Sequence, residues 1–475
     1  MRFRGLVLFL LCWSIATHVA VTSVGAQTGA SETLAITAVT IVDVTANDAS
    51  SALRSGQTVI VHRGKITHVG PTGKVTVPRG AQYVDGRGKY LVPGLWDAHV
   101  HLSNTGPSAL PAYVANGITS VRDLGGSISD FRTWERQFKD GSLVGPRLFK
   151  AGPNIEGAWW LDRALAVMAS DPALAKFPML KFSPRERLDG PKDASRAVGA
   201  IAALSVDVVK FRNLRPSEFQ AVAAEAKKRG LPLAGHMPRG VSIGEAAEQG
   251  LRSLEHAESV TLSLGDADDI ARRAQFRRVA SAGAAITPTL VSDVAYRQTP
   301  DDSARKIISD TANRIDPRRR YVARQLLDGW NFGLASKRFD PVIDWAESHR
   351  RQVADMHRAF QAGVPLLVGT DLGTSLIYPG FSVHEELQLL VREVRLSPFE
   401  ALRAATINPA RNLGLADTTR GIAVGQRADL VLLDADPLQD IQNATRIRGV
   451  VLNGRFLSRA NLDTLLMTAE KLARE

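Results

Sequence analysis

The chain has little cysteine and few aromatic residues, and this scarcity narrows its chemistry. A single cysteine, Cys12, occurs among 475 residues, so neither a disulfide framework nor a cysteine-based zinc site can form. Aromatic residues make up only 6% of the chain, and no run of basic residues interleaved with aromatics accompanies the formal net charge of +11. We therefore predict no nucleic-acid partner. A metal ion would have to be held by histidine, by carboxylate or by a less usual ligand.

The N-terminus has the pattern of a secretory signal peptide. Arg2 and Arg4 precede an apolar run over residues 6–15, and short residues stand at 24–26 before the cleavage point. We predict that residues 1–26 are removed and that the protein is secreted or periplasmic. An uncleaved anchor is the alternative, but the run is short for a bilayer and no later stretch has membrane length, so we predict no stable membrane insertion. Without the signal peptide, 57 basic and 48 acidic side chains remain, a net charge of +9.

Both ends of the chain show the period-two pattern that is typical of β-strands. Residues 58–62 and 65–69 are separated by a two-residue turn with glycine, which predicts a β-hairpin. The same pattern returns at residues 428–433 and 449–454. Chain ends often lie close together, so we predict one small β domain built from both of them. Its two parts are residues 27–91 and residues 413–475, the second with a terminal helix.

The centre of the chain, residues 92–412, alternates short apolar strands with amphipathic helices, such as a helix over 216–229 that Gly230 ends. This alternation predicts an α/β fold with a parallel sheet. Eight strands are expected, the number that closes a TIM barrel, and the extra length predicts insertions at 154–195 and 303–340. The expected strands are residues 95–101, 118–123, 147–151, 207–210, 232–236, 252–256, 285–288 and 365–371.

Polar residues fall at the ends of several of these strands. His99 and His101 end the first strand, and because side chains alternate along a strand, both point to the same side and could bind one metal ion. The carboxyl ends of barrel strands meet at one mouth. Histidine is scarce, with ten in the chain, and four lie at strand ends, so a metal site is predicted there. The other residues of this set are Lys210, His236, His256 and Asp371. His349 and His357 lie on a helix predicted over 341–362 and are expected to be solvated.

Four segments together resemble the amidohydrolase superfamily, particularly secreted members related to prolidases and imidazolonepropionases. They are Leu-Val-Pro-Gly-Leu-Trp-Asp-Ala-His-Val-His at 91–101, Gly-Thr-Asp at 369–371, the stretch 398–410, and Gly-Gln-Arg-Ala-Asp-Leu-Val at 425–431. The resemblance implies a distorted TIM (β/α)8 barrel together with a β-sandwich formed from both termini.

The resemblance also implies a binuclear centre, most often of zinc. His99, His101 and Asp371 would hold the more buried ion, His236 and His256 the more exposed one, and Lys210 would bridge both as a carbamate. Burial disfavours the charged form of a lysine, and a neutral amine can react with carbon dioxide. The alternative for Lys210 is an ion pair with Asp207 or Glu255 in a mononuclear enzyme. Asp371 would also take the proton of the attacking water and pass it to the leaving nitrogen.

Three further residues are candidates for substrate contacts, and each has a structural alternative. His384 follows the eighth strand and could orient a substrate or cap a helix. Arg122 ends the second strand and could bind a substrate carboxylate or pair with a neighbouring acid. Trp159, with Trp160, could form an aromatic wall or pack its own loop. Relatives with dipeptidase activity carry Gly-Gly-His here, but residues 154–160 contain no histidine, so their specificity does not carry over.

The sequence therefore predicts a secreted, metal-dependent hydrolase that cleaves a carbon–nitrogen bond in a small molecule such as an amide, a dipeptide or an N-acyl amino acid. Hydrolysis of a lactone or phosphotriester at the same binuclear site is the alternative, because fold does not fix function. A non-catalytic binding protein on a degenerate barrel is the third, and the complete set of six candidate ligands argues against it. Assembly into a homo-oligomer is left open.

Overall fold

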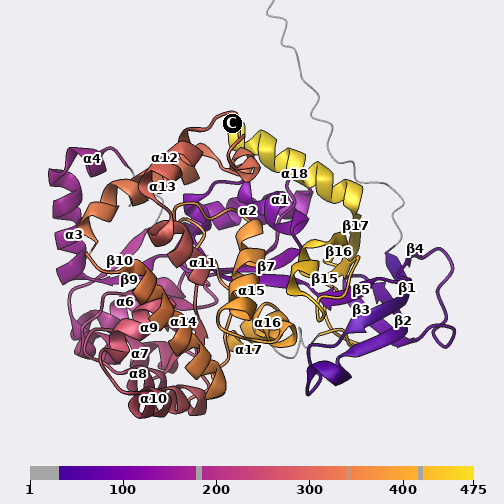
Figure 1. Ribbon diagram of the computed structural model, residues 1–475, viewed down its shortest axis with the longest axis horizontal. Coiled ribbons are helices and arrows are strands. Elements are labelled where there is room, and N and C mark those ends of the chain that lie inside the picture. The colour runs from indigo at the N-terminus through magenta and orange to yellow at the C-terminus, as the bar shows by residue number, and fades with distance from the viewer. Residues whose placement is uncertain (1–31, 178–183, 341, 416–420) are drawn as a thin grey trace, which may run out of the picture.

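The computed structural model describes residues 32–177, 184–340, 342–415 and 421–475. The predicted signal peptide, residues 1–26, lies outside the described residues. Figure 1 shows a sheet on one side of the molecule and a larger set of parallel strands and helices on the other. In the part of the chain that the structure describes, no helix is long and apolar enough to cross a membrane.

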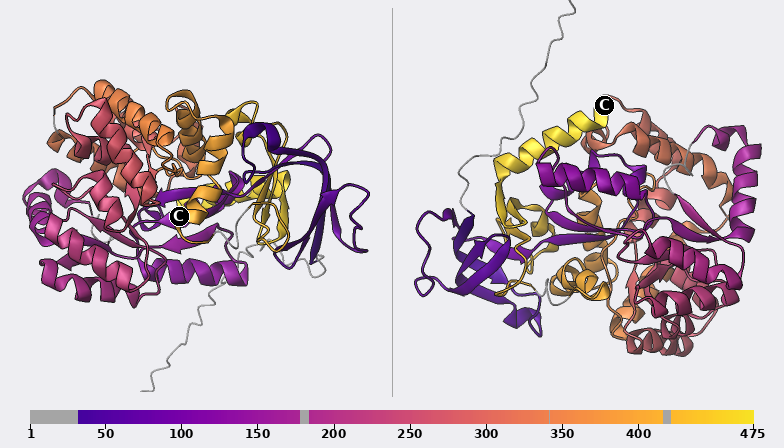
Figure 2. Two further views of the ribbon diagram at one scale, coloured as in Figure 1. Left: turned by 90° about the horizontal axis from the view of Figure 1, so that it is seen from below. Right: turned by 180° about the vertical axis from the view of Figure 1, so that it is seen from behind.

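Strands from both ends of the chain form one sheet of eight strands, in the order β17-β16-β15-β5-β1-β2-β3 with β4 paired to β1. The ends meet where β15 runs antiparallel to β5, with Leu432 opposite Leu91. The sheet is curled (Figure 2), and a sandwich of two sheets stays a prediction. The strands are β1 (Thr33–Val42), β2 (Leu53–His62), β3 (Lys65–Pro71), β4 (Gln82–Asp85), β5 (Tyr90–Pro93), β15 (Leu430–Leu433), β16 (Ile447–Leu452) and β17 (Arg455–Ser458).

The predicted hairpin is present as β2 and β3, which pair antiparallel. Its two turn residues, Arg63 and Gly64, have φ angles of 47° and 78°. Positive φ at both central positions suits the twist of a tight hairpin, and glycine adopts it without steric cost. Inward-facing residues such as Ile36, Val59 and Leu430 form the buried core of this sheet. The period-two pattern in the sequence is thus the packing pattern of this core.

The central strands are parallel and lie in two sheets, β6-β7-β8 and β10-β9-β11-β12-β13-β14. Strands are found at the first seven of the eight predicted positions. The two strands that the sequence did not predict, β9 and β10, lie in the insertion expected at 154–195. The strands are β6 (Leu95–Val100), β7 (Ile118–Asp123), β8 (Arg147–Lys150), β9 (Asn154–Gly157), β10 (Arg185–Leu188), β11 (Val209–Arg212), β12 (Leu233–Gly235), β13 (Leu251–Glu255) and β14 (Ala285–Thr287).

The eighth predicted strand, at 365–371, is not a regular strand, but it is hydrogen-bonded on both sides. Leu366 forms a parallel bridge with Ile286 of β14, and the Asp371 N–H donates to the His99 carbonyl of β6 over 2.8 Å. The φ of Asp371 is 57°, which ends the extended conformation at this residue. The segment thus links the two parallel sheets. A closed barrel stays a prediction, because in the described ranges no ladder pairs β8 with β9 or β10.

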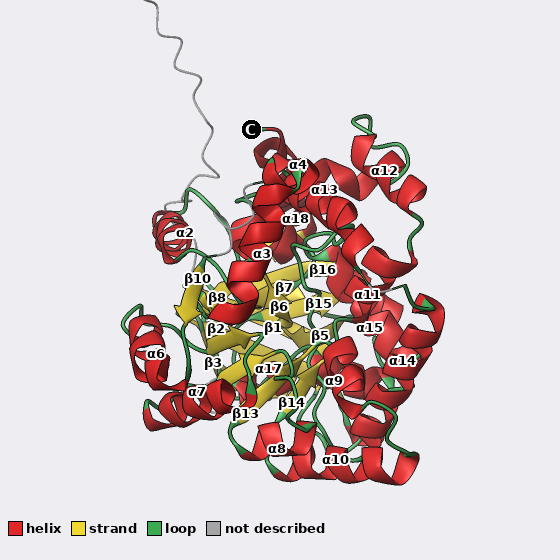
Figure 3. Cartoon of the chain, turned by 90° about the vertical axis from the view of Figure 1, so that its left-hand side faces the viewer, coloured by secondary structure: helices red, strands yellow, loops and turns green. Residues whose placement is uncertain are grey.

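Helices surround the parallel strands (Figure 3), which confirms the α/β class. The helix predicted at 216–229 is α7, which has Pro216 in its first turn and ends before Gly230, whose φ is 68°. The helices are α1 (Ala109–Ala115), α2 (Ile128–Asp140), α3 (Ala158–Ser170), α4 (Pro172–Ala175), α6 (Ala194–Ala202), α7 (Pro216–Lys228), α8 (Ile243–Glu248), α9 (Ala257–Leu264), α10 (Asp269–Ser281), α11 (Leu290–Asp293), α12 (Asp301–Ser309), α13 (Arg324–Ser336), α14 (Trp345–Gln361), α15 (Phe381–Arg392), α16 (Pro398–Ala404), α17 (Ile407–Asn412) and α18 (Arg459–Arg474).

Candidate metal centre

The histidines at the end of β6 both face one carboxylate. Nε2 of His99 lies 3.4 Å from Oδ1 of Asp371, and Nε2 of His101 lies 3.3 Å from the same oxygen. The alternation of side chains along β6 places both rings on one side, as the spacing predicts. Asp371 reaches them because its segment is hydrogen-bonded to β6. The structure therefore brings these three predicted ligands together.

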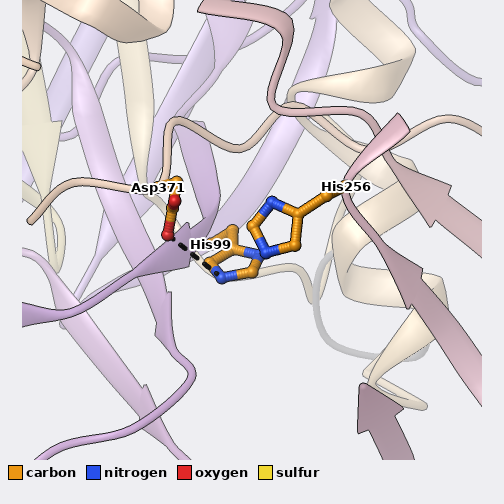
Figure 4. A group of neighbouring side chains, drawn as sticks. All are labelled: His99, His256 and Asp371. Carbon is orange, nitrogen blue, oxygen red and sulfur yellow. Dashed lines mark ion pairs between the residues drawn. The ribbon is translucent and has the colours of Figure 1, made fainter. Parts of the chain in front are cut away.

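Two more histidines complete a row of rings. The ring centroids of His99 and His256 are 4.5 Å apart, and those of His256 and His236 are 4.7 Å apart. Figure 4 shows His256 and Asp371 on either side of His99. One ligand atom from each of His99, His256 and Asp371 lies within 4.8 Å of the others, a spacing that could hold a metal ion. Five predicted ligands, from the ends of β6, β12 and β13 and from the segment at 365–371, thus converge.

Lys210 lies on β11, fully buried, with no hydrogen-bond partner for its Nζ. Asp207 and Glu255, the two acids considered as partners from the sequence, form no hydrogen bond with this Nζ. The carboxylate of Asp207 accepts the backbone N–H of Lys150, and Glu255 is bound to His99 and Arg122. Burial lowers the pKa of Lys210 to about 7, and the positive charge of Arg212 contributes to the same shift. A substantial neutral fraction of this amine is therefore present at neutral pH.

The cluster favours the protonation states that bind metals. Burial and the charge of Lys210 lower the pKa of His99 to about 4 and that of His236 well below the usual range. Burial lowers the pKa of His256 in the same way. For Asp371 burial opposes ionisation, but the hydrogen bond from His101 holds its pKa well below normal. Neutral imidazoles and an ionised carboxylate are the forms that coordinate metals.

Glu255 supports the cluster by holding the ring of His99, a role that was not predicted from the sequence. Its Oε2 lies 2.8 Å from Nδ1 of His99, and its Oε1 accepts a hydrogen bond from Nη2 of Arg122, also at 2.8 Å. Strand alternation would point Glu255 and His256 to opposite sides. His256 instead has a φ of 68°, so both side chains contact His99. A carboxylate on the second ring nitrogen fixes the orientation and tautomer of a metal-binding histidine.

Asp97 holds the eighth segment against β6. Its Oδ1 accepts the Thr370 N–H at 2.9 Å, and its Oδ2 accepts the hydroxyls of Thr370 at 2.6 Å and of Tyr113 at 3.0 Å. Because Thr370 precedes Asp371, these bonds position the shared carboxylate. The motif residues Asp97 and Thr370 were visible in the sequence, but nothing there showed that they bind each other.

A cavity opens over the cluster, and the three residues predicted to contact substrate, Arg122, His384 and Trp159, do not line it. Arg122 is buried in its ion pair with Glu255, the alternative raised for it. His384 is buried on α15, and its Nε2 donates to the Asn116 carbonyl at the end of α1, at 2.9 Å, which is a capping role. Trp159 turns its Nε1 to the Asn213 carbonyl, at 3.0 Å. The structure thus shows each of these residues in a structural contact, the alternative raised for it, and their substrate binding stays a prediction.

His349 corrects another expectation, because it is buried rather than solvated. Its Nδ1 lies 2.8 Å from Asp293 and its Nε2 lies 2.8 Å from Glu393. Burial by itself lowers the pKa of His349, but the bonds to two carboxylates raise it above the usual value. The sequence hid this role because the acids come from α11 and the end of α15, far from α14 along the chain. His357 on the same helix is half-buried and bonded to the Val394 carbonyl.

A cavity of about 440 Å³ opens over the cluster, with the predicted ligands His101, His236, His256 and Asp371 in its wall. Both expected insertions contribute to it. Helix α3 supplies an apolar face that begins at Trp160, and α13 supplies Phe332. Residues spaced by three or four positions share one face of a helix, which explains why so much of α3 lines the cavity. The lining residues of α3 are Trp160, Leu161, Ala164, Leu165 and Met168.

The sequence profile of the amidohydrolase family matches residues 90–457, so the chain belongs to this family. Ochratoxinase of Aspergillus niger is 23% identical over 396 residues, 74% of this chain and 72% of that protein. Imidazolonepropionase of Salinispora tropica is 26% identical over 424 residues, 83% of this chain and 90% of that protein. The crystal structure of a putative prolidase from Bifidobacterium longum has a TM-score of 0.65 at 23% identity and covers 92% of this chain and 99% of that one, a likeness of fold.

The predicted family is thereby confirmed, and the protein is an enzyme, a hydrolase of a family that acts on carbon–nitrogen bonds. Members of this family generally use divalent metal ions, and the residues present fit such ions. Three buried nitrogens at the cluster lack a hydrogen-bond partner: Nε2 of His99, Nδ1 of His101 and Nζ of Lys210. Buried polar atoms left unpaired are costly unless a ligand satisfies them.

Proposed function

We propose that the protein is a metal-dependent amidohydrolase that cleaves the C–N bond of an amide, a dipeptide or an N-acyl amino acid. The observation that carries the proposal is the convergence of three neutral imidazoles and the ionised Asp371 at the floor of a 440 Å³ cavity. The match to ochratoxinase and to prolidase structures supports the choice of bond. The parallel strands and the linking segment at 365–371 would then form a distorted TIM barrel.

The residues divide into two ligand groups around Lys210. His99, His101 and Asp371 would hold the more buried ion, and His236 and His256 the more exposed one, with zinc as the expected metal. Lys210, with its nitrogen unpaired, would add to carbon dioxide as the neutral amine, lose a proton and become a carbamate that would supply anionic oxygen ligands to both groups. When bound, the ions would lower the pKa of a water and polarise the scissile carbonyl.

The chain supplies proton transfer and orientation. Asp371 lines the cavity, and its Oδ2 accepts a hydrogen bond from the Thr374 hydroxyl at 2.8 Å, which fixes the carboxylate plane. Asp371 would accept the proton of the attacking water and deliver it to the leaving nitrogen. Glu255 holds His99 in place, and the apolar wall of α3 excludes water from one side of the cavity.

A substrate panel tests this proposal. The purified protein is incubated with N-acyl amino acids, dipeptides, lactones and phosphotriesters, and release of amine or acid is measured. Amine release that disappears in Asp371→Asn is expected. Turnover of the lactones and phosphotriesters alone would overturn the C–N assignment in favour of the other hydrolytic chemistry that the sequence leaves open.

Export is a separate proposal that rests on residues 1–26. Arg2, Arg4 and the apolar run at 6–15 would direct the chain across a membrane, and cleavage would leave Gln27 as the first residue. Mass spectrometry of the N-terminal peptide of the protein from its natural source tests it. A peptide that begins at Gln27 is expected, whereas one that retains Arg2 and Arg4 would contradict cleavage.

A further inference from the structure

One positive charge in the cavity wall has no partner. Among the residues that the structure describes, the guanidinium of Arg212 makes neither a hydrogen bond nor an ion pair, and its Nε is buried. Its one contact of note is with Trp160, whose ring centroid lies 5.8 Å from the guanidinium carbon. A guanidinium carries five N–H donors, so leaving it unpaired in a cavity wall is unfavourable unless a ligand completes it.

The other arginines in the cavity wall are neutralised. Nε of Arg185 lies 3.2 Å from Oε2 of Glu156, and Nη1 of Arg297 lies 2.7 Å from Oε1 of Glu258. Glu156 also accepts a hydrogen bond from Asn213, at 2.7 Å, so its second oxygen is occupied as well. The carboxylate of Glu156 therefore neutralises Arg185, and a net positive charge remains at Arg212.

The position of Arg212 relates it to the metal centre. Lys210 and Arg212 are two residues apart on β11, so their side chains lie on the same face of the strand, about 6.6 Å apart along it. Arg212 is the one nearer the carboxyl end of the strand, where the cavity opens. An anionic group held by Arg212 would thus place the atoms next to it above Lys210 and the histidines.

Another part of the wall of the same cavity is apolar. Leu161, Leu165 and Met168 of α3 and Phe332 of α13 line it, and none of them offers a hydrogen bond. A ligand that fills the cavity therefore needs a charged end and a bulky apolar end. The two ends must be joined closely enough for the bond between them to lie over the metal ligands.

We propose that Arg212 binds the free carboxylate of the substrate, and that the enzyme selects amides that carry this carboxylate together with a bulky apolar group, as an N-acyl derivative of an apolar amino acid does. This assignment deepens the proposed C–N hydrolysis and rests on it. The planar guanidinium would bind the carboxylate with two parallel hydrogen bonds, and stacking on Trp160 would keep the plane aligned. Arg212 would then be the residue that makes the enzyme prefer the acid to its neutral analogue.

The test compares an N-acyl-phenylalanine with its carboxamide, which differ only in the charged group. In Arg212→Met the ratio of kcat/KM values, acid over amide, should fall about 10- to 100-fold, the size of a charge-assisted hydrogen-bonded pair. Arg212→Lys keeps the charge but lacks the planar guanidinium. Its acid-to-amide ratio should lie between those of the wild type and of Arg212→Met. Any coordination of the carboxylate by metal is common to all variants and cancels in the comparison. Thermal unfolding checks that each variant is folded.

Arg239→Met is the matched control. Arg239 is exposed and stacks on a tryptophan as Arg212 does, with its guanidinium carbon 5.2 Å from the ring centroid of Trp159, but it does not line the cavity. The control should keep the wild-type acid-to-amide ratio. An unchanged ratio in Arg212→Met, or an equal loss in Arg239→Met, would overturn the assignment.

A binding measurement separates this inference from the proposed reaction. 4-Phenylbutanoate has a carboxylate and an apolar end but no C–N bond, and 4-phenylbutan-1-ol is its neutral counterpart. Calorimetric titration should show that Arg212→Met weakens binding of the acid about 10-fold or more and leaves binding of the alcohol unchanged. If the enzyme cleaves no C–N bond in the panel, the proposed function fails, and this titration still decides the role of Arg212. Equal affinity of wild type and Arg212→Met for the acid would overturn it.

Discussion

The buried pair of Glu255 and Arg122 allows a prediction whose size follows from the structure. Glu255 is fully buried. Its Oε2 contacts His99, and its Oε1 accepts hydrogen bonds from Arg122 and from the Ser253 hydroxyl. Although burial opposes ionisation, the charge of Arg122 and the bond from His99 hold the pKa of Glu255 well below its usual range, so it is ionised at neutral pH. In Glu255→Gln the shape is kept and the charge is lost.

Two separate losses are expected in Glu255→Gln. The guanidinium of Arg122 stays buried without a counter-charge, which costs about 3–5 kcal/mol in the free energy of unfolding. His99 loses the carboxylate that fixes its ring, which weakens metal binding about 10- to 100-fold. The double variant Glu255→Gln with Arg122→Met removes the uncompensated charge. It should recover part of the unfolding free energy while metal binding stays weak.

Urea unfolding of the metal-free protein measures the first loss, and competition with a coloured chelator measures the second. Glu248→Gln is the control, since Glu248 forms an exposed pair with Arg278, at 2.7 Å, and should cost less than about 1 kcal/mol. If Glu255→Gln destabilises the protein no more than Glu248→Gln, the reasoning about the buried pair is refuted. Unchanged metal affinity would refute the role assigned to Glu255 at His99.

Three other predictions follow from the same geometry. Lys210→Ala should remove most of the bound metal, measured by plasma mass spectrometry, and full retention would contradict a bridging role. Asp371→Asn should lose turnover at least about 100-fold while its fold is kept, since it removes the group that transfers the proton. Glu386 is buried, accepts the backbone N–H groups of Leu290 and Val291, and has its pKa raised to about 8 by burial. The folded state therefore binds more protons between pH 4.5 and 8, so the stability of wild type relative to Glu386→Gln should fall as pH rises, by up to about 1.4 kcal/mol per pH unit. Parallel stability curves for the two proteins would contradict this.

Much of the site could be predicted because its residues stand at strand ends. The His-x-His spacing at His99 and His101 needs only the alternation of a strand to bring two rings together. His236 follows the apolar stretch that forms β12, as predicted. Lys210 was expected at the end of its strand but lies inside β11, which continues to Arg212. These inferences required no knowledge of tertiary contacts beyond the order of the sheet.

What could not be predicted depends on contacts between distant segments or on unusual backbone. The positive φ of His256 allows both Glu255 and His256 to contact His99, and no residue type in the sequence indicates this backbone conformation. His384 and Arg122 lie near the right strands, but their hydrogen bonds turn them away from the cavity. Arg212 could have been found from the sequence, since it shares a strand face with Lys210. That its guanidinium has no partner could not have been predicted from the sequence.

Metal reconstitution tests the central claim most directly. The protein is stripped with a chelator and titrated with Zn²⁺ while hydrolysis of an N-acyl amino acid is followed. If His99, His101, Lys210, His236, His256 and Asp371 hold a binuclear centre, activity should be absent without metal and should rise to a break at about two equivalents per chain. Full activity in the stripped protein, or a break at one equivalent, would contradict the account.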